Sequence, residues 1–347
     1  RHFFWHEIWD YFGLKGDKGN QPFLDSENSL PGTKFFPLGK INYAENMLKK
    51  NNEETAIIFK CEDKIYRRVS WKNLNKQDLS VTNFLKSIGV KKNDRIAAYL
   101  PNIPETVIVM LATASLGAVF SSASPDFGSD GVLDRFGQIT PKVFITTDGY
   151  YYNGKEINIT EKVEQVINSM PSVENIILIP FLNSKNIYEG DNVYFYDNII
   201  KNFQKGVLNF EPLDMDHPLY IMYSSGTTGM PKCIVHSVGG VILKHIVELG
   251  LHSNAKNNSI FFYFTTCGWM MWNWLVSGLM LGSTICLYDG SPFYPNGYVL
   301  WDFAEKERIN FFGTSAKYID ALSKEGLDVR SRYKLLNLNT IGSTGSP

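Results

Sequence analysis

One contiguous run combines the residue types that hold phosphate groups: Ser224-Ser225-Gly226-Thr227-Thr228-Gly229-Met230-Pro231-Lys232. Its two glycines let the backbone turn tightly, so that backbone N–H groups come close to an anion. Its four hydroxyl groups add donors for several phosphate oxygens, and Lys232 supplies a point charge of the kind that binds phosphate. The run therefore predicts a loop that binds the phosphates of a ligand.

The segments around this run suit such a loop. Residues 219–223 and 233–236 are short and apolar and predict strands, and Gly239-Gly240 opens a helix that extends to about residue 251. Ligands in open α/β sheets bind where a strand passes into a loop. The run is not a Walker loop, because Met230-Pro231 separates Gly229 from Lys232 and a strand follows. A surface turn without a ligand is the alternative, which the two flanking apolar strands disfavour.

The rest of the chain alternates strand patterns with helix patterns. Strands are expected at residues 95–99, 118–120, 142–146 and 176–179, and helices at 74–88, 104–116 and 161–170. Residues 54–58 and 64–69 predict a hairpin within an aromatic-rich, irregular first part of the chain. This alternation predicts an α/β fold in which mainly parallel sheets are flanked by helices.

One uncharged stretch, residues 257–288, is long enough to cross a membrane. Thr265, Thr266 and Gly268 interrupt it, and so does the pair Gly282-Ser283. We therefore expect a strand at 260–264, a helix at 269–281 and a second strand at 284–288, all buried in a parallel sheet. A membrane span is the alternative, which the Asn, Ser, Thr and Gly residues disfavour.

The composition excludes broad classes of partner. The 347 residues contain 34 Lys and Arg against 35 Asp and Glu, so the net charge of −1 does not draw the protein to nucleic acid or an anionic membrane. Cys61, Cys233, Cys267 and Cys286 form no close pair, which favours reduced core thiols in the cytosol over disulfides or a metal site. The length favours two packed units. Nothing in the sequence indicates an oligomeric state.

The run at 223–232 resembles the signature loop of the acyl-adenylate-forming superfamily, which includes acyl-CoA synthetases, luciferases and peptide-synthetase adenylation domains. Ile234-Val235-His236 with Gly239-Gly240 is similar to the short-chain acyl-CoA synthetases. Further stretches are similar to those members of this branch that activate acetoacetate, namely 124–128, 134–136, 138–143, 148–155, 268–274, 287–292, 313–318 and 343–347. The similarity covers essentially the whole chain.

The resemblance implies a domain organisation. Residues 1–75 would be an N-terminal extension of the acyl-CoA-synthetase type, and residues 76–347 would be part of the large AMP-binding (adenylation) domain. That domain would be incomplete at its C-terminal end, and the small C-terminal domain of the family would be absent. Arg1 and Pro347 both look like cuts through a longer protein, so we expect the chain by itself not to complete adenylation.

The resemblance also implies roles for individual residues. Thr227, Thr228 and Lys232 would act in catalysis, and ATP would be bound by Ser224, Ser225, Gly226, Thr227, Thr228, Gly229, Lys232, Gly345, Ser346 and Pro347. The acyl pocket and the adjoining pantetheine tunnel would be lined by Trp269, Met270, Met271, Asn273, Thr314, Ser315 and Ala316. Lys155 would lie near the CoA phosphate, and Asn273 or Trp269 would donate to a second carbonyl of the substrate. His236 is expected to pair within the sheet, and core packing is the alternative role for Trp269 and its neighbours.

The implied reaction is ATP-dependent ligation of a small carboxylic acid to CoA, with acetoacetate as the expected acid and AMP and pyrophosphate as products. ATP, Mg²⁺ and CoA would be its cofactor and co-substrates, and positioning with charge neutralisation would suffice without a nucleophilic side chain. Two alternatives stay open: a ligase for acetate or propionate, and a nucleotide-binding module without turnover.

Overall fold

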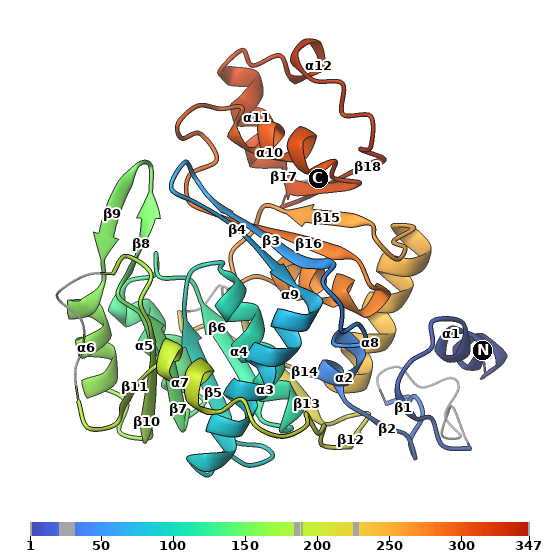
Figure 1. Ribbon diagram of the computed structural model, residues 1–347, viewed down its shortest axis with the longest axis vertical. Coiled ribbons are helices and arrows are strands. Elements are labelled where there is room, and N and C mark those ends of the chain that lie inside the picture. Colours follow the sequence, from blue (N-terminus) through green and yellow to red (C-terminus); the bar gives the residue numbers. More distant parts are fainter. Residues whose placement is uncertain (1, 21–31, 184–187, 189, 225–228, 346–347) are drawn as a thin grey trace.

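The computed structural model describes residues 2–20, 32–183, 188, 190–224 and 229–345. Two large sheets dominate these residues, and helices lie between the sheets and on their outer faces (Figure 1). In the described part of the chain, no helix has the length and apolar character needed to span a bilayer.

The first large sheet has seven strands in the order β11-β10-β7-β5-β6-β13-β14. Its strands are β5 (Arg95–Tyr99), β6 (Val119–Ala123), β7 (Val143–Thr147), β10 (Asn175–Ile179), β11 (Val193–Phe195), β13 (Pro218–Ser224) and β14 (Lys232–Ser237). All neighbouring pairs are parallel except β13–β14, which form an antiparallel hairpin at the edge. The phosphate loop predicted from the sequence is the connection of this hairpin.

The second large sheet has six strands in the order β18-β17-β15-β16-β3-β4. Its strands are β3 (Thr55–Cys61), β4 (Ile65–Ser70), β15 (Ile260–Tyr263), β16 (Thr284–Asp289), β17 (Phe311–Ser315) and β18 (Thr340–Thr344). Only β3 and β4 are antiparallel. The predicted hairpin is therefore confirmed, and it belongs to the same sheet as strands more than 200 residues later. The division of the chain at residue 75 stays a prediction.

The remaining elements are mostly helices. They are α1 (His2–Tyr11), α2 (Tyr43–Met47), α3 (Trp71–Ser87), α4 (Pro104–Ser115), α5 (Ser129–Phe136), α6 (Thr160–Asn168), α7 (Tyr196–Asn202), α8 (Val238–Ile246), the π-helix η1 (Val247–His252), α9 (Met270–Val276), the 3₁₀ helix η2 (Ser277–Leu281), α10 (Val299–Glu307), α11 (Ala316–Lys324) and α12 (Val329–Arg332). Five short strands complete the set: β1 (Gly16–Asp17), β2 (Lys40–Ile41), β8 (Gly149–Tyr152), β9 (Lys155–Asn158) and β12 (Leu213–Asp214).

The main core lies between the two large sheets. Along β5, Ile96 and Ala98 join this core, whereas Ala97 and Tyr99 face the opposite side of the sheet and pack with residues of α5 and α6. Successive side chains of a strand point to opposite faces, so both faces of β5 are buried. Eleven of the twelve residues of α4 are buried, which fits a helix enclosed between two sheets.

The predicted α/β fold with mainly parallel sheets flanked by helices is confirmed. The uncharged stretch forms β15, α9, η2 and β16, and β15 pairs with β16 in parallel. The helix predicted from residue 74 begins earlier, at Trp71, because the Ser70 hydroxyl accepts from the Asn73 N–H and caps it. The helix predicted to reach residue 251 is α8 up to Ile246 and then the π-helical turn η1.

One expectation about the cysteines is wrong. Cys61, Cys267 and Cys286 are buried free thiols, as predicted, but Cys233 is exposed. The reason is its place on β14, the edge strand of the seven-stranded sheet, where no further strand covers it among the described residues.

Candidate functional site

The predicted phosphate loop lies at the tip of the β13–β14 hairpin. The ladder pairs Tyr223 with Cys233 and Ser224 with Lys232, so Lys232 faces Ser224 directly across the hairpin. Lys232 is exposed, and Gly229 has a φ of +110°, a backbone conformation that favours glycine. The other loop residues assigned to ATP, Ser225, Gly226, Thr227 and Thr228, lie outside the described residues.

A second contact fixes the base of this loop. The Gln138 side-chain amide donates to the Pro231 carbonyl oxygen over 2.8 Å, and the Cys233 thiol lies 3.6 Å from the Gln138 amide oxygen. Gln138 lies just after α5. Its hydrogen bond therefore connects α5 to Pro231, the residue that precedes Lys232.

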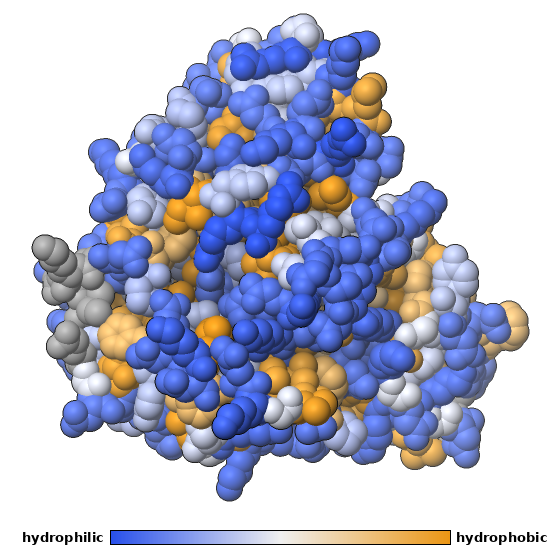
Figure 2. All heavy atoms as spheres, in the orientation of Figure 1, coloured by the Kyte–Doolittle hydropathy of each residue, from blue (hydrophilic) through white to orange (hydrophobic). Residues whose placement is uncertain are grey.

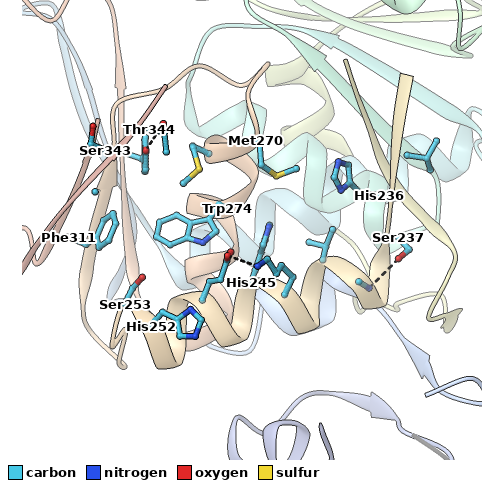
Figure 3. A pocket seen from close by; sticks show the side chains of 18 residues that line it. His236, Ser237, His245, His252, Ser253, Met270, Trp274, Phe311, Ser343 and Thr344 are labelled. Carbon is cyan, nitrogen blue, oxygen red and sulfur yellow. Dashed lines mark hydrogen bonds and ion pairs between the residues drawn. The ribbon is translucent and has the colours of Figure 1, made fainter. Parts of the chain in front are cut away.

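A cavity of about 740 Å³ lies beside the hairpin (Figure 3). Its walls come from β14, α8 with η1, α9, and the strands β15, β17 and β18. The lining residues are Val235, His236, Ser237, Gly240, Val241, Lys244, His245, Glu248, His252, Ser253, Tyr263, Met270, Met271, Trp274, Phe311, Gly342, Ser343 and Thr344. The volume is that of a site for a small ligand. Since β14 begins at Lys232 and lines the cavity from Val235, the end predicted to bind phosphate and the cavity are on the order of 10 Å apart along the strand.

Of the four residues in and just before α9 that were predicted to line the acyl pocket, two line this cavity and two do not. Met270 and Met271 line the cavity. Trp269 precedes the helix and is 58% exposed, so it is not a core residue. Asn273 is buried outside the cavity lining, and its amide nitrogen lies 3.5 Å from both the Trp269 carbonyl oxygen and the Met222 sulfur.

The ends of β17 and β18 hold the next group of predicted residues. Thr314 pairs with Ser343 and Ser315 pairs with Thr344, and Ser343 and Thr344 line the cavity. The Tyr263 hydroxyl donates to the Thr314 carbonyl oxygen over 3.1 Å and lies 3.1 Å from the Thr344 hydroxyl. These contacts fasten the carboxyl ends of both strands to the cavity wall.

The three predicted pocket residues at and just after the end of β17 differ in whether their side chains already have a hydrogen-bond partner: Thr314, Ser315 and Ala316. The Thr314 hydroxyl is buried and has no hydrogen-bond partner among the described residues. The Ser315 hydroxyl caps α11 by accepting from the Tyr318 N–H, and Ala316 is the first residue of that helix. Gly345 has a φ of +93°, and the other residues assigned to adenine, Ser346 and Pro347, lie outside the described residues.

Lys155 is exposed on the β8–β9 hairpin, where it pairs with Tyr152. The carboxylate of Glu62 holds the tip of this hairpin, since it accepts from the N–H groups of Asn153 and Gly154 at 2.6 and 2.8 Å. Glu62 also accepts from the Ser291 N–H, which ties the hairpin to the end of β16. Lys155 is thus a surface cation on a braced hairpin, outside the cavity lining.

Three histidines line the cavity, and none of them was assigned a site role from the sequence; His252 is the last residue of η1. His236 lies on β14 against the ring of Tyr220, with ring centroids 5.2 Å apart, and burial lowers its pKa. His245 lies on α8 and is 4% exposed, and burial lowers its pKa to about 3 with smaller contributions from His236 and Lys244. Both imidazoles are therefore neutral near pH 7. The only sequence signal for His245 is a polar residue inside an apolar helix, which is also typical of a core histidine.

Charged side chains reach the cavity at one place. Lys244 and Glu248 form an ion pair over 2.8 Å at one helical turn's spacing, and both line the cavity. The rest of the α9 wall is apolar, with Met270, Met271 and Trp274. Across the described ranges of the chain, no three His, Cys, Asp or Glu side chains gather closely enough to hold a metal ion.

Comparison with known proteins agrees with this geometry. The family model described as "AMP-binding enzyme" matches residues 44–347. The chain belongs to the AMP-binding enzyme family. The match includes both large sheets from β3 onward, the hairpin and the cavity.

Individual members of the family are similar over nearly the whole chain. Acetoacetyl-coenzyme A synthetase of Rhizobium meliloti (strain 1021) is 47% identical over 99% of this chain and 53% of its own length. Acetoacetyl-CoA synthetase of Xenopus tropicalis is 41% identical, with the same two shares. A solved structure of acetoacetyl-CoA synthetase from Streptomyces lividans superimposes with a TM-score of 0.92 at 38% identity, covering 99% of this chain and 53% of that one. The chain spans about half the length of these relatives.

Proposed function

We propose that this chain supplies the nucleotide loop and the acyl cavity of an ATP-dependent acid–CoA ligase. The proposed reaction converts acetoacetate, ATP and CoA into acetoacetyl-CoA, AMP and pyrophosphate through an acyl-adenylate. One observation carries this proposal: three segments far apart in sequence, the β13–β14 hairpin, α9 and the end of β18, border one cavity. Membership of the AMP-binding enzyme family and the identity to acetoacetyl-CoA synthetases support the choice of acid.

In the proposed first step, the carboxylate of the acid attacks the α-phosphorus of ATP and displaces pyrophosphate. Lys232 and Ser224, opposite each other at the base of the loop, would bind phosphate oxygens, as would Ser225, Gly226, Thr227, Thr228 and Gly229. Mg²⁺ would accompany ATP and neutralise part of its charge. Fixed donors and one cation aimed at the phosphates stabilise the charge that moves to pyrophosphate, without a covalent enzyme intermediate.

In the second step, the CoA thiol would displace AMP from the acyl-adenylate. Met270, Met271 and Trp274 would enclose the short acyl chain and exclude water, which protects the activated carbonyl from hydrolysis. The buried, unpartnered hydroxyl of Thr314 is suited to meet the ligand where the thiol arrives, beside Ser315 and Ala316. Lys155 would meet a CoA phosphate at the surface, and Gly345, Ser346 and Pro347 would pack on adenine.

The test is AMP formation by the full-length protein that carries this chain, with Mg-ATP and CoA and with acetate, propionate, butyrate, 3-hydroxybutyrate and acetoacetate in turn. We expect the highest kcat/KM with acetoacetate. A preference for acetate or propionate would retain the reaction and change its substrate. ATP binding without turnover of any acid would favour the nucleotide-binding module instead.

The proposed location is the cytosol. All four cysteines are free thiols, which suits a reducing compartment. The net charge of −1 provides no general attraction to nucleic acid, so the proposed partners are the acid, ATP and CoA.

A further inference from the structure

Trp274 brings a hydrogen-bond donor without a protein partner to the wall of the cavity. It lines the cavity from α9, one helical turn after Met270, and it is only 6% exposed. An indole Nε1 always carries a hydrogen and can only donate, so its role does not depend on a tautomer. Within the described ranges of the chain, no acceptor is hydrogen-bonded to this N–H. Figure 3 shows the Trp274 ring between Phe311 and His245.

Two other buried indoles show what distinguishes this N–H. Trp272, two positions earlier on α9, donates to the Asn102 amide oxygen over 2.8 Å. Trp301 on α10 is 6% exposed, as Trp274 is, but its Nε1 is fully enclosed by protein atoms. The Nε1 of Trp274 is not enclosed in this way, and its residue lines the cavity. Because a buried donor without a partner costs about 1–3 kcal/mol, a ligand oxygen that accepts from it is stabilised.

Aromatic residues of the second sheet hold the Trp274 ring in place. Its centroid lies 5.2 Å from that of Phe311 and 6.2 Å from those of Phe261 and Tyr263. Phe311, the closest of these rings, is the first residue of β17, whereas ligands of parallel sheets bind at the carboxyl ends of the strands. We therefore expect Trp274 to meet the part of the substrate that lies farthest from the nucleotide, which is the acyl chain beyond the carboxylate.

The neighbouring imidazole of His245 does not supply this donor. The Ser277 hydroxyl donates to the Asn273 carbonyl oxygen over 3.0 Å. Its oxygen then accepts from the Tyr43 hydroxyl at 2.8 Å and from Nδ1 of His245 at 2.7 Å. Burial keeps His245 neutral by lowering its pKa, so with the hydrogen on Nδ1 its Nε2 can only accept. The donor that this wall offers to a ligand is therefore Trp274.

The surroundings of the indole make its N–H decisive for the choice of acid. Met270, Met271 and Val241 present apolar surface to the same cavity. The nearby charged groups, Lys244 and Glu248, compensate each other in an ion pair. A carbonyl oxygen opposite the N–H regains a hydrogen bond that it loses with water, whereas a methylene group there would leave the donor unpaired. A site with one such donor discriminates strongly between acids that have the oxygen and acids that lack it.

We propose that Trp274 donates a hydrogen bond from Nε1 to a carbonyl oxygen on the acyl chain, and that this bond selects the oxo acid over the equivalent hydrocarbon acid. This inference rests on the proposed acid–CoA ligase function. Trp274 thereby takes the place of Asn273 and Trp269, the donors expected from the sequence, because neither of them lines the cavity. It acts as a specificity-determining residue.

The test compares acetoacetate with butyrate, which has a methylene group in place of the keto group. AMP formation is measured in the full-length protein for the wild type, Trp274→Phe and Trp301→Phe. Trp274→Phe removes the N–H and keeps an aromatic ring, and Trp301→Phe is the matched control because it removes an equally buried indole N–H outside the cavity. We expect the acetoacetate/butyrate ratio of kcat/KM to fall by at least about tenfold in Trp274→Phe, chiefly by loss of acetoacetate activity, and to stay unchanged in Trp301→Phe.

The ratio separates the lost hydrogen bond from the smaller ring, because a gap in the wall affects both acids. Thermal unfolding of each variant checks that the fold is kept. Trp274→Met, whose flexible side chain fills irregular gaps and also lacks the donor, takes the place of Trp274→Phe if the latter does not fold.

The outcomes separate this inference from the proposed function. An unchanged ratio in a folded Trp274→Phe protein overturns the role of Trp274 and leaves acid–CoA ligation standing. An equal fall of the ratio in Trp301→Phe, or a wild type that uses butyrate as well as acetoacetate, overturns it in the same way. A wild type that forms AMP from no acid overturns the proposed function, and the inference with it.

Discussion

The two sides of the cavity are built in opposite ways. The phosphate hairpin is continuous in sequence, exposed, and defined by small residues and one lysine between β13 and β14. The helical wall is buried and assembled from Tyr43, His245 and Ser277, which lie on α2, α8 and η2. A ligand whose charge moves during the reaction needs donors and a cation aimed at its phosphates, whereas selection among uncharged acyl chains needs a surface from which water is excluded. This difference supports the proposal that the hairpin carries the chemistry and that the wall selects the acid.

The largest effect is expected at the hairpin. Lys232→Gln removes the cation opposite Ser224, and we expect kcat/KM for AMP formation to fall by about 100- to 1000-fold for every acid, a typical cost of losing one group that stabilises transition-state charge. The measurement is acid-dependent pyrophosphate release by the full-length protein. Lys324→Gln is the matched control, because Lys324 forms an exposed ion pair with Asp320 on α11. A fall confined to one acid would break the assignment of chemistry to the hairpin.

The second effect is expected at the wall and should depend on the acid. Met271→Trp fills part of the cavity, and we expect roughly a tenfold loss with butyrate and little loss with acetate, since one methylene group in an apolar pocket changes discrimination by about 10- to 200-fold. The ratio of the two kcat/KM values is the measurement, and Leu336→Trp, at an 85% exposed position, is the control. Equal losses with both acids would show that the wall does not select by size.

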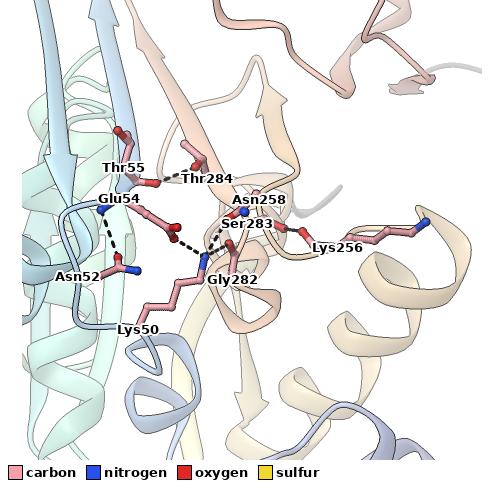
Figure 4. A network of polar contacts seen from close by, with 9 residues as sticks. All are labelled: Lys50, Asn52, Glu54, Thr55, Lys256, Asn258, Gly282, Ser283 and Thr284. Carbon is pink, nitrogen blue, oxygen red and sulfur yellow. Dashed lines mark hydrogen bonds and ion pairs between the residues drawn. The ribbon is translucent and has the colours of Figure 1, made fainter.

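The third effect concerns stability and the segment that carries Tyr43. Lys50 donates to the Glu54 carboxylate, the Asn258 amide oxygen and the Gly282 carbonyl oxygen, each at 3.0 Å (Figure 4). It thereby joins the chain after α2 to the turn that precedes β16. Lys50→Met keeps the apolar stem and leaves acceptors unpaired, so we expect a loss of about 1–2 kcal/mol in the free energy of unfolding.

Urea unfolding monitored by tryptophan fluorescence measures this loss. Lys64→Met is the control, because the ion pair of Lys64 within the described residues is with the neighbouring Asp63 at the surface. Since Lys50 is not a lining residue of the cavity, the acetoacetate/butyrate ratio should stay the same. A changed ratio would show that the position of α2 also governs selection among acids.

The smallest effect is a pH dependence that distinguishes the buried wall from the exposed hairpin. Folding lowers the pKa of His245 from 6.5 to about 3, so the unfolded chain binds a proton between these values and the folded chain does not. Stability is thus fully present above pH 6.5 and is lost as the pH falls toward 3. We expect the His245 contribution to fall by about 1 kcal/mol between pH 7.5 and 5.5.

The measurement is the difference in unfolding free energy between wild type and His245→Leu at these two pH values. Since other groups titrate alike in both proteins, the difference isolates His245. The same comparison with Lys232→Gln should show no such change. A pH-independent difference for His245→Leu would mean that the imidazole is accessible to protons in the folded protein.

Local sequence was sufficient for several of the elements. Strand β5 has the predicted bounds, because a short apolar run specifies a buried strand locally. Helix α4 differs from its prediction by one residue at its C-terminal end, because Pro104 at its start and Gly117 after its end mark its limits in the sequence. The π-helical turn η1 was not predicted, since nothing in the spacing of residues 247–252 departs from an ordinary helix. The exposure of Cys233 was missed because an edge strand and a central strand have the same local pattern.

The candidate site also has one part that local sequence predicts and another that depends on the tertiary structure. The sequence by itself predicted the phosphate loop, because its glycines, hydroxyls and lysine are neighbours along the chain and can be recognised without the fold. Tertiary structure alone decided that Met270 and Met271 face the cavity while Trp269 is exposed and Asn273 is turned aside. It also joined Tyr43 to Ser277 across 234 positions and Ser277 to His245 across 32. Such partners meet only when both sheets and the helices between them have packed, so no local pattern encodes them.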